Sequence, residues 1–162
     1  MHENTNLLRW PKRACWKAFI YYGVLLNILW CLIYGGASYV TSLHPYRVRL
    51  HLDAELPIPF IPSTAIVYLS LFPMLWMSLF VLHTPSKLTL FAKALGYLFL
   101  LSGVGFLLLP ADDVRTREIG SGVFFQVYSF ANWINLNHNY MPSLHVGMAV
   151  LCARIYSGEA SL

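Results

Sequence analysis

Charged residues are scarce in this chain. They make up 11% of its 162 residues, against about a quarter of an average soluble domain. Hydrophobic residues reach 57%, above the roughly 45–50% of soluble proteins. The first apolar run, residues 18–40, holds no charged residue. This balance argues against an ordinary soluble domain and predicts an all-α integral membrane bundle.

Cysteine is also rare, and its spacing excludes two common uses. Cys15, Cys31 and Cys152 form no C-x-x-C pair, so the sequence indicates neither a disulfide framework nor a zinc site. Asp112 and Asp113 are adjacent, but no third carboxylate or histidine is spaced to complete a metal site with them. We therefore expect no metal and no cofactor.

A nucleic-acid-binding patch is missing as well, although the net charge is +4. The basic residues instead gather just before the first apolar run, at Arg9, Lys12, Arg13 and Lys17. Such a cluster is typical of a cytoplasmic flank. We predict that residues 1–17 form a cytoplasmic N-terminus, that residues 110–142 lie at the outer, periplasmic or lumenal face, and that the chain binds no nucleic acid.

The apolar runs predict about four transmembrane helices within residues 18–162, in a multi-pass protein of the plasma or inner membrane. A spanning helix needs about 20 apolar residues, and the expected helices lie near 18–40, 63–82, 91–109 and 143–156. Pro73 predicts a kink in the second helix. Residues 83–93 read as a short polar turn. The last helix is short for a full span, because only residues 144–153 are apolar before Arg154.

Two further segments are expected at the membrane surface. The stretch "LDAELPIPFIPS" contains three prolines that deny it a regular helix, yet it is rich in large apolar residues. A proline-rich interfacial or re-entrant segment between the first two helices fits both facts. The stretch "VFFQVYSFANWINLNHNY" is aromatic and amphipathic, which is typical of an interfacial helix.

The stretch "NHNYMPSLHVGMAV" carries the candidate chemistry. The N-terminus of a helix that starts at Ser143 offers free N–H groups and the positive end of the dipole to an anion. The Ser143 hydroxyl adds a donor, and His145 on the first turn can donate or accept a proton near neutral pH. Arg117 or Arg115, on the preceding loop, can supply a fork for phosphate oxygens. Together these residues predict a phosphate site.

Each of these residues also has a plainer interpretation. A histidine near a helix start is often only an interfacial polar residue, and Arg115 can hold lipid headgroups instead of a substrate. His138 reads as a solvated loop residue.

The motif and its context resemble the type 2 phosphatidic acid phosphatase superfamily, which includes lipid phosphate phosphatases and inositol phosphorylceramide synthases. Its three motifs are K-x-x-x-x-x-x-R-P, P-S-x-x-H and S-R-x-x-x-x-x-H-x-x-x-D, and the second opens the fourth helix. Here "MPSLHV" matches the second motif in the form of the inositolphosphotransferase-like branch. "LDAELPIPFIPSTAIVY" is similar to that branch as well. The resemblance covers about residues 50–150.

The resemblance implies roles for individual residues. His145 would be the general acid that protonates the leaving group, while Ser143 and Arg117, with Arg115 nearby, would hold the phosphate. The first motif departs from the pattern, since Glu118 replaces its proline and Pro110 its lysine. The third motif, which supplies the nucleophilic histidine, is absent. The chain therefore resembles the first four of six helices, and a second chain is one possible source of the rest.

Three functions follow as expectations. The first is a membrane phosphatase or phosphotransferase that acts on a lipid phosphate or diphosphate at the outer face through a phosphohistidine. The second, motivated by the missing nucleophile, is a catalytically inactive membrane protein or structural partner. The third is transfer of inositolphosphate to a lipid acceptor, because water and an alcohol can attack the same intermediate.

Overall fold

The computed structural model describes residues 8–43, 45–55, 57–112, 120–134 and 139–160. These residues form helices and no strand, which confirms the predicted all-helical fold; one isolated bridge joins Val48 to Ala111. Among them, three helices are long and apolar enough to cross a membrane: Arg13–Ser42, Thr64–Val81 and Pro85–Leu108.

The first of these helices is continuous over 30 residues but changes its winding midway. It consists of α1 (Arg13–Trp30), a π-helical segment η1 (Cys31–Gly35) and α2 (Gly36–Ser42). Its far end is closed by Arg47, whose guanidinium donates to the Thr41 carbonyl at 3.0 Å. A cation suits this position, because the last carbonyls of a helix lack intrahelical donors and carry the negative end of the dipole.

The second helix breaks where the sequence predicts a kink. It comprises α3 (Thr64–Leu69) and α4 (Leu71–Val81), which are separated by Ser70. Pro73 has no N–H to donate to the carbonyl one turn earlier, so the hydrogen-bond ladder is interrupted there. The Ser70 hydroxyl donates to the Val67 carbonyl at 2.6 Å, which satisfies a backbone acceptor beside the break.

The third helix, α5 (Pro85–Leu108), begins earlier than expected. The prediction of a polar turn over residues 83–93 was wrong from Pro85 onward. Thr84 acts as N-cap, with its side chain accepting a hydrogen bond from the Lys87 N–H at 3.3 Å. Pro85 fits the first helical position, where no N–H is needed.

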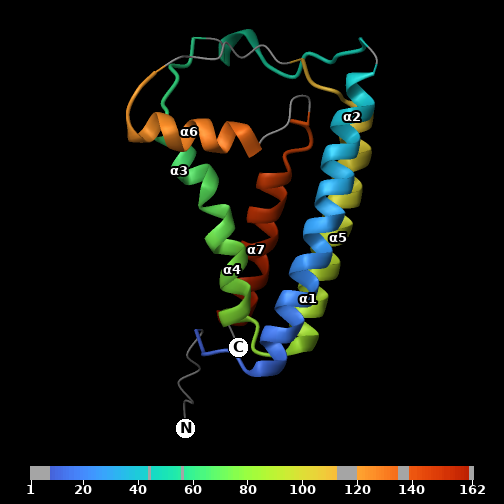
Figure 1. Ribbon diagram of the computed structural model, residues 1–162, viewed down its shortest axis with the longest axis vertical. Helices are drawn as coiled ribbons and strands as arrows, with labels where there is room; N and C mark the ends of the chain where they lie inside the picture. Colours follow the sequence, from blue (N-terminus) through green and yellow to red (C-terminus); the bar gives the residue numbers. More distant parts are fainter. Residues whose placement is uncertain (1–7, 44, 56, 113–119, 135–138, 161–162) are drawn as a thin grey trace.

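Three more helices complete the described chain, and the shortest is the 3-10 helix η2 (Asp53–Glu55), which lies between α2 and α3. α6 (Val123–Ile134) lies across the upper end of the molecule, and α7 (Leu144–Ala160) runs down beside α4 (Figure 1). α7 has 17 residues and is not among the helices long and apolar enough to cross a membrane by themselves. A fourth membrane-spanning helix therefore remains a prediction.

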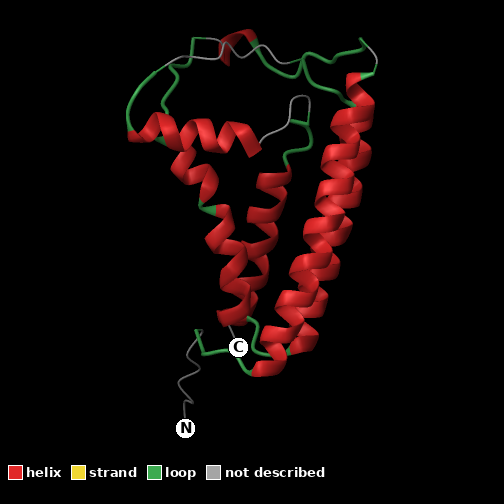
Figure 2. Cartoon of the chain, in the orientation of Figure 1, coloured by secondary structure: helices red, strands yellow, loops and turns green. Residues whose placement is uncertain are grey.

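The helices form two neighbouring groups. The helix from α1 to α2 packs along α5, while α4 packs against α7, which also contacts α5 (Figures 1 and 2). The start of α1 and the end of α7 lie at the lower end. The beginning of α7, helix α6 and the segments around residues 45–63 lie at the upper end. The candidate motif is thus at the end away from the basic flank.

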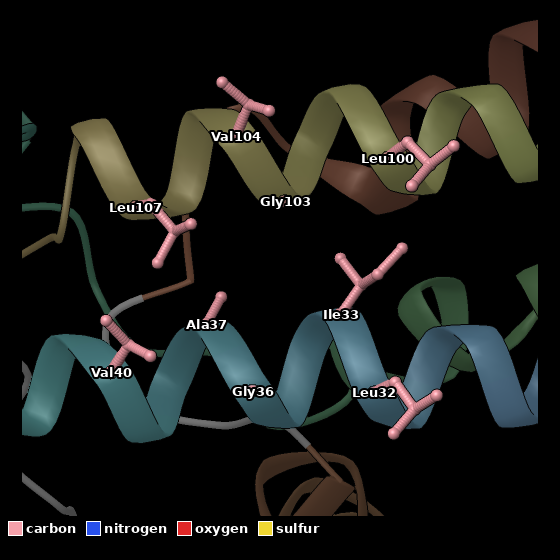
Figure 3. Close-up of a pocket in the computed structure, with 9 residues that line it drawn as sticks. All are labelled: Leu32, Ile33, Gly36, Ala37, Val40, Leu100, Gly103, Val104 and Leu107. Atoms are coloured by element: carbon pink, nitrogen blue, oxygen red, sulfur yellow. The ribbon is translucent and has the colours of Figure 1, made fainter.

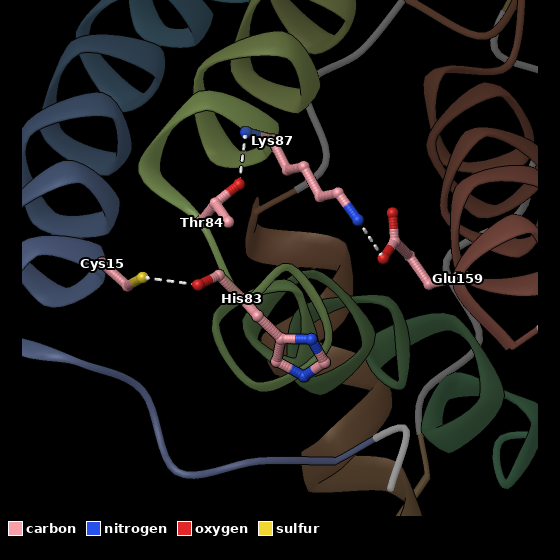
Figure 4. A network of polar contacts seen from close by, with 5 residues as sticks. All are labelled: Cys15, His83, Thr84, Lys87 and Glu159. Carbon is pink, nitrogen blue, oxygen red and sulfur yellow. Dashed lines mark hydrogen bonds and ion pairs between the residues drawn. The ribbon is translucent and has the colours of Figure 1, made fainter. Parts of the chain in front are cut away.

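Polar contacts join neighbouring helices and turns at the lower end of the molecule (Figure 4). Lys87 at the start of α5 forms an ion pair with Glu159 near the end of α7, at 2.6 Å between Nζ and Oε2. The Cys15 thiol donates to the His83 carbonyl at 3.4 Å. These contacts link α1 to the turn before α5, and α5 to α7, at the end where the basic residues of the sequence gather.

The first helix and α5 pack closely at Gly103 of α5 (Figure 3). A Cβ atom added to Gly103 would lie 2.5 Å from Cγ2 of Ile33, closer than atoms can pack. Nothing lies within 4 Å of a Cβ added to Gly36, on the opposing helix. Small residues allow this close approach of backbones, as they do in the helix pairs of membrane proteins.

We predict that Gly103→Ala destabilises the chain relative to Gly36→Ala. Both changes add one methyl group to a helix interior, so their helix propensities cancel. Overpacking at Ile33 should make Gly103→Ala less stable by about 1–3 kcal/mol. Thermal unfolding in detergent micelles measures the difference, and equal stabilities of the two variants would contradict the close contact.

Candidate functional site

The first turn of α7 carries the candidate phosphate site. α7 begins directly after Ser143, whose Oγ accepts a hydrogen bond from the Val146 N–H at 3.4 Å. The Ser143 carbonyl accepts the Gly147 N–H at 3.0 Å. Ser143 thus caps the helix, and its side chain is exposed. Because the hydroxyl accepts in this cap, its own hydrogen is available to a ligand, beside the N-terminal N–H groups that no helical acceptor can reach.

His145 lies on the same turn and contacts a different helix. Its imidazole stacks on the ring of Tyr68 in α3, with 3.8 Å between ring centroids and 25° between planes. The histidine is half-buried. The contact joins the two stretches that carry the family resemblance, since Tyr68 ends "IPFIPSTAIVY" and His145 ends "PSLH".

Pro142 fixes the other side of this turn. A Cβ atom added to Gly105 of α5 would lie 2.2 Å from the Pro142 Cδ, so the proline ring rests on bare backbone. A second close contact lies one turn into α7, where a Cβ added to Gly147 would meet a Leu98 methyl at 2.9 Å. Glycines on both helices therefore let α7 begin against α5.

The proline-rich segment also contributes to this end of the molecule. Phe60 packs edge-on against Tyr128 of α6, with 4.6 Å between centroids, and against Phe125 at 6.4 Å. α3, which follows this segment, packs against α6 as well. The segment thus connects α6 to the helix that bears Tyr68.

The predicted arginines are not placed beside the site. Arg115 and Arg117 lie outside the described residues, as does His138. Two other arginines of the upper end have local partners: Arg49 forms an ion pair with Asp53, and Arg47 closes α2. The structure therefore brings together Ser143 and His145 and leaves the arginine clamp a prediction.

The described residues also bear on a metal site and on a ligand groove. Within those ranges, no three His, Cys, Asp or Glu residues lie together in a way that could hold a metal ion. An open groove of about 340 Å³ lies between the first helix and α5, lined only by apolar residues and glycines (Figure 3). Its walls supply no group for chemistry, and such a surface suits contact with lipid chains or helices.

Comparison with known proteins does not extend this description. No family model, no curated protein and no solved structure matches the chain. The site is therefore defined by its own geometry. It consists of a capped helix N-terminus, a half-buried histidine and the aromatic ring stacked on that histidine.

Sequence reasoning missed two residues of this geometry. Tyr68 ends the stretch "LDAELPIPFIPSTAIVY", whose resemblance assigns it no role, and Gly105 lies outside the motifs of the sequence. The contact of Tyr68 with His145 depends on how α3 and α7 pack, which local spacing does not reveal. For Gly105, the glycine itself was a signal of close approach, but its partner Pro142 was not predictable.

We predict that Tyr68→Leu removes the aromatic environment of His145, whereas Tyr68→Phe preserves it. A stacked ring shifts the imidazole protons upfield, so these protons should move downfield in the leucine variant only. Loss of the ring pair should also cost about 1 kcal/mol of stability. Proton NMR in detergent measures the shift.

Tyr97→Leu is the matched control, because Tyr97 is an exposed aromatic residue of α5. Unchanged imidazole protons in Tyr68→Leu, or an equal change in the Tyr97 control, would rule out the stacking.

Proposed function

We propose that this chain is part of a membrane-embedded phosphatase or phosphotransferase that binds a lipid phosphate or diphosphate at the N-terminus of α7. The observation that carries the proposal is the pairing of a Ser143 cap with His145 on the same turn. The resemblance to the type 2 phosphatidic acid phosphatase superfamily supports the same reaction class.

The phosphate would be held by donors that are already oriented. The Ser143 hydroxyl and the N–H groups of Leu144 and His145 point toward the start of the helix, where the dipole favours negative charge. Donors fixed in this way stabilise the charge that develops on the phosphoryl oxygens without reorganising. Arg115 and Arg117 are the proposed clamp for the remaining oxygens.

His145 is the proposed general acid. As the bond between phosphorus and the leaving oxygen breaks, the imidazolium would donate its proton to that oxygen. The Tyr68 ring restricts the imidazole to one plane, so the proton would be delivered from a defined direction. The bond electrons leave with the oxygen, and the phosphoryl group passes to the nucleophile.

The nucleophile is proposed to come from outside these 162 residues. The family motif that provides a nucleophilic histidine does not occur in these residues, so the proposal places the nucleophile on further helices, for which a second polypeptide is one source. The phosphoryl group would then pass to water, or to an alcohol such as a lipid acceptor. Transfer of inositolphosphate is the second form of the same proposal.

The proposed location is a plasma or inner membrane, with the N-terminus in the cytoplasm. The basic flank before α1 supports this orientation. α7 begins at the end of the molecule away from that flank (Figure 1), so the phosphate site would face the periplasm or a lumen.

The alternative function is that of an inactive membrane protein or structural partner, which the missing nucleophile motif favours. Such a protein could still bind a lipid phosphate at α7 without turning it over. Release of inorganic phosphate from dioctanoyl phosphatidic acid by the purified chain alone would exclude this alternative.

We predict that the full chain in nanodiscs binds dioctanoyl phosphatidic acid and that Ser143→Ala weakens this binding about tenfold, the effect of one hydrogen bond to a charged group. Dioctanoylglycerol, which lacks the phosphate, should not bind at this site. Isothermal titration measures both affinities.

Ser157→Ala is the matched control. Ser157 is an exposed serine of α7, and its hydroxyl donates to the Arg154 carbonyl, three residues earlier, at 3.0 Å. Equal affinities of the two serine variants, or no binding by the unmodified chain, would contradict the proposal.

A further inference from the structure

A buried carboxamide lies just ahead of the candidate site. Asn139 is only 6% exposed, and its Nδ2 donates to the Tyr34 carbonyl at 2.7 Å. The two residues are separated by 105 positions in the sequence. The bond therefore joins the segment before α7 to the first membrane helix.

The acceptor of this bond lies in an unusual part of that helix. Tyr34 belongs to the π-helical segment η1, Cys31–Gly35. Wider winding disturbs the regular ladder of an α-helix, and a side chain from elsewhere can then bond to its backbone. Tyr34 itself is buried, stacked on Trp30 at 5.1 Å between centroids and edge-on to Phe106 at 5.6 Å. The carbonyl is thus held in place by aromatic packing around its side chain.

Burial of the Asn139 carboxamide oxygen costs folding free energy. Its Oδ1 is buried without a hydrogen-bond partner among the described residues, and buried polar atoms are rarely left so. An apolar residue would avoid this cost. The presence of a buried asparagine here is explained if its single bond to Tyr34 has a specific use.

Asn139 is close in sequence to the candidate site. Ser143 follows it by four residues, and Pro142, which lies between them, rests on Gly105 of α5. The segment before α7 is therefore fixed at two points, one on η1 and one on α5. Both points belong to the helix pair packed through Gly103, so they move together.

We propose that Asn139 is a positioning residue, whose bond to the Tyr34 carbonyl fixes the first turn of α7 and with it Ser143 and His145. The proposal rests on the proposed function for its use in phosphate binding, although the positioning itself can be measured without a ligand. Asn139 does not touch the phosphate; it holds the helix start that does.

The test compares Asn139→Ala with Asn27→Ala in the full chain in nanodiscs. Both remove an amide donor, and Asn27 also donates to a backbone carbonyl, that of Gly23 at 2.8 Å, from an exposed position. Asn139→Leu is a second variant of similar side-chain size, in case the alanine leaves a cavity that prevents folding. Thermal unfolding shows which variants are folded.

Two ligand-free readouts follow the first turn of α7. Amide hydrogen exchange at Val146 and Gly147 should become about tenfold faster in the Asn139 variants, as expected for the loss of one buried hydrogen bond. Exchange near Glu159, which Lys87 holds, should not change. The imidazole protons of His145 should lose their upfield shift, which a general loss of stability would not cause in the folded protein. Unchanged exchange and unchanged imidazole protons would overturn the proposal.

Binding of dioctanoyl phosphatidic acid separates this inference from the function on which it rests. Weaker binding by the Asn139 variants than by Asn27→Ala supports both. Faster exchange without any lipid binding by the unmodified chain supports the positioning and contradicts the phosphate site. Binding that depends on Ser143 but not on Asn139, with unchanged exchange, contradicts the positioning alone.

Discussion

The ring of Pro142 lies against the bare backbone of Gly105 in α5, and the start of α7 depends on this contact. It sets where the chain turns into α7, so Ser143 becomes the cap of a helix that begins beside α5. From there α7 descends along α4, and His145 meets Tyr68. A side chain at position 105 would displace the proline and thus the helix start.

Hydrogen bonds from side chains satisfy backbone carbonyls where the helices of this apolar chain are irregular. An unpaired carbonyl or N–H inside a membrane costs several kcal/mol, and three irregular places in the described helices have a hydrogen-bonding partner. Ser70 bonds to the carbonyl of Val67 at the break between α3 and α4, and Arg47 closes the end of α2. These irregularities occur where the helices are interrupted or end, and one of them, η1, receives a donor from the segment before α7.

The sequence predicted the elements of this fold better than their contacts. Long uncharged runs predict helices reliably, because a membrane leaves few alternatives, and Pro73 marked the break in the second helix. The start of α5 was misplaced, since Lys87 and Lys93 made a helix surface look like a turn. At the site, Ser143 and His145 follow from one local motif. Tyr68 could not be predicted, because its contact with His145 depends on the tertiary packing that brings α3 near the start of α7.

If the first turn of α7 receives a phosphate, as proposed, the backbone amides of that turn report the binding directly. Titration of the ¹⁵N-labelled chain in nanodiscs with dioctanoyl phosphatidic acid, followed by NMR, is the most direct measurement. We predict that the Leu144 and His145 amide protons shift downfield, and that dioctanoylglycerol leaves them unchanged. Shifts confined to the basic flank before α1, with α7 unaffected at saturation, would contradict it.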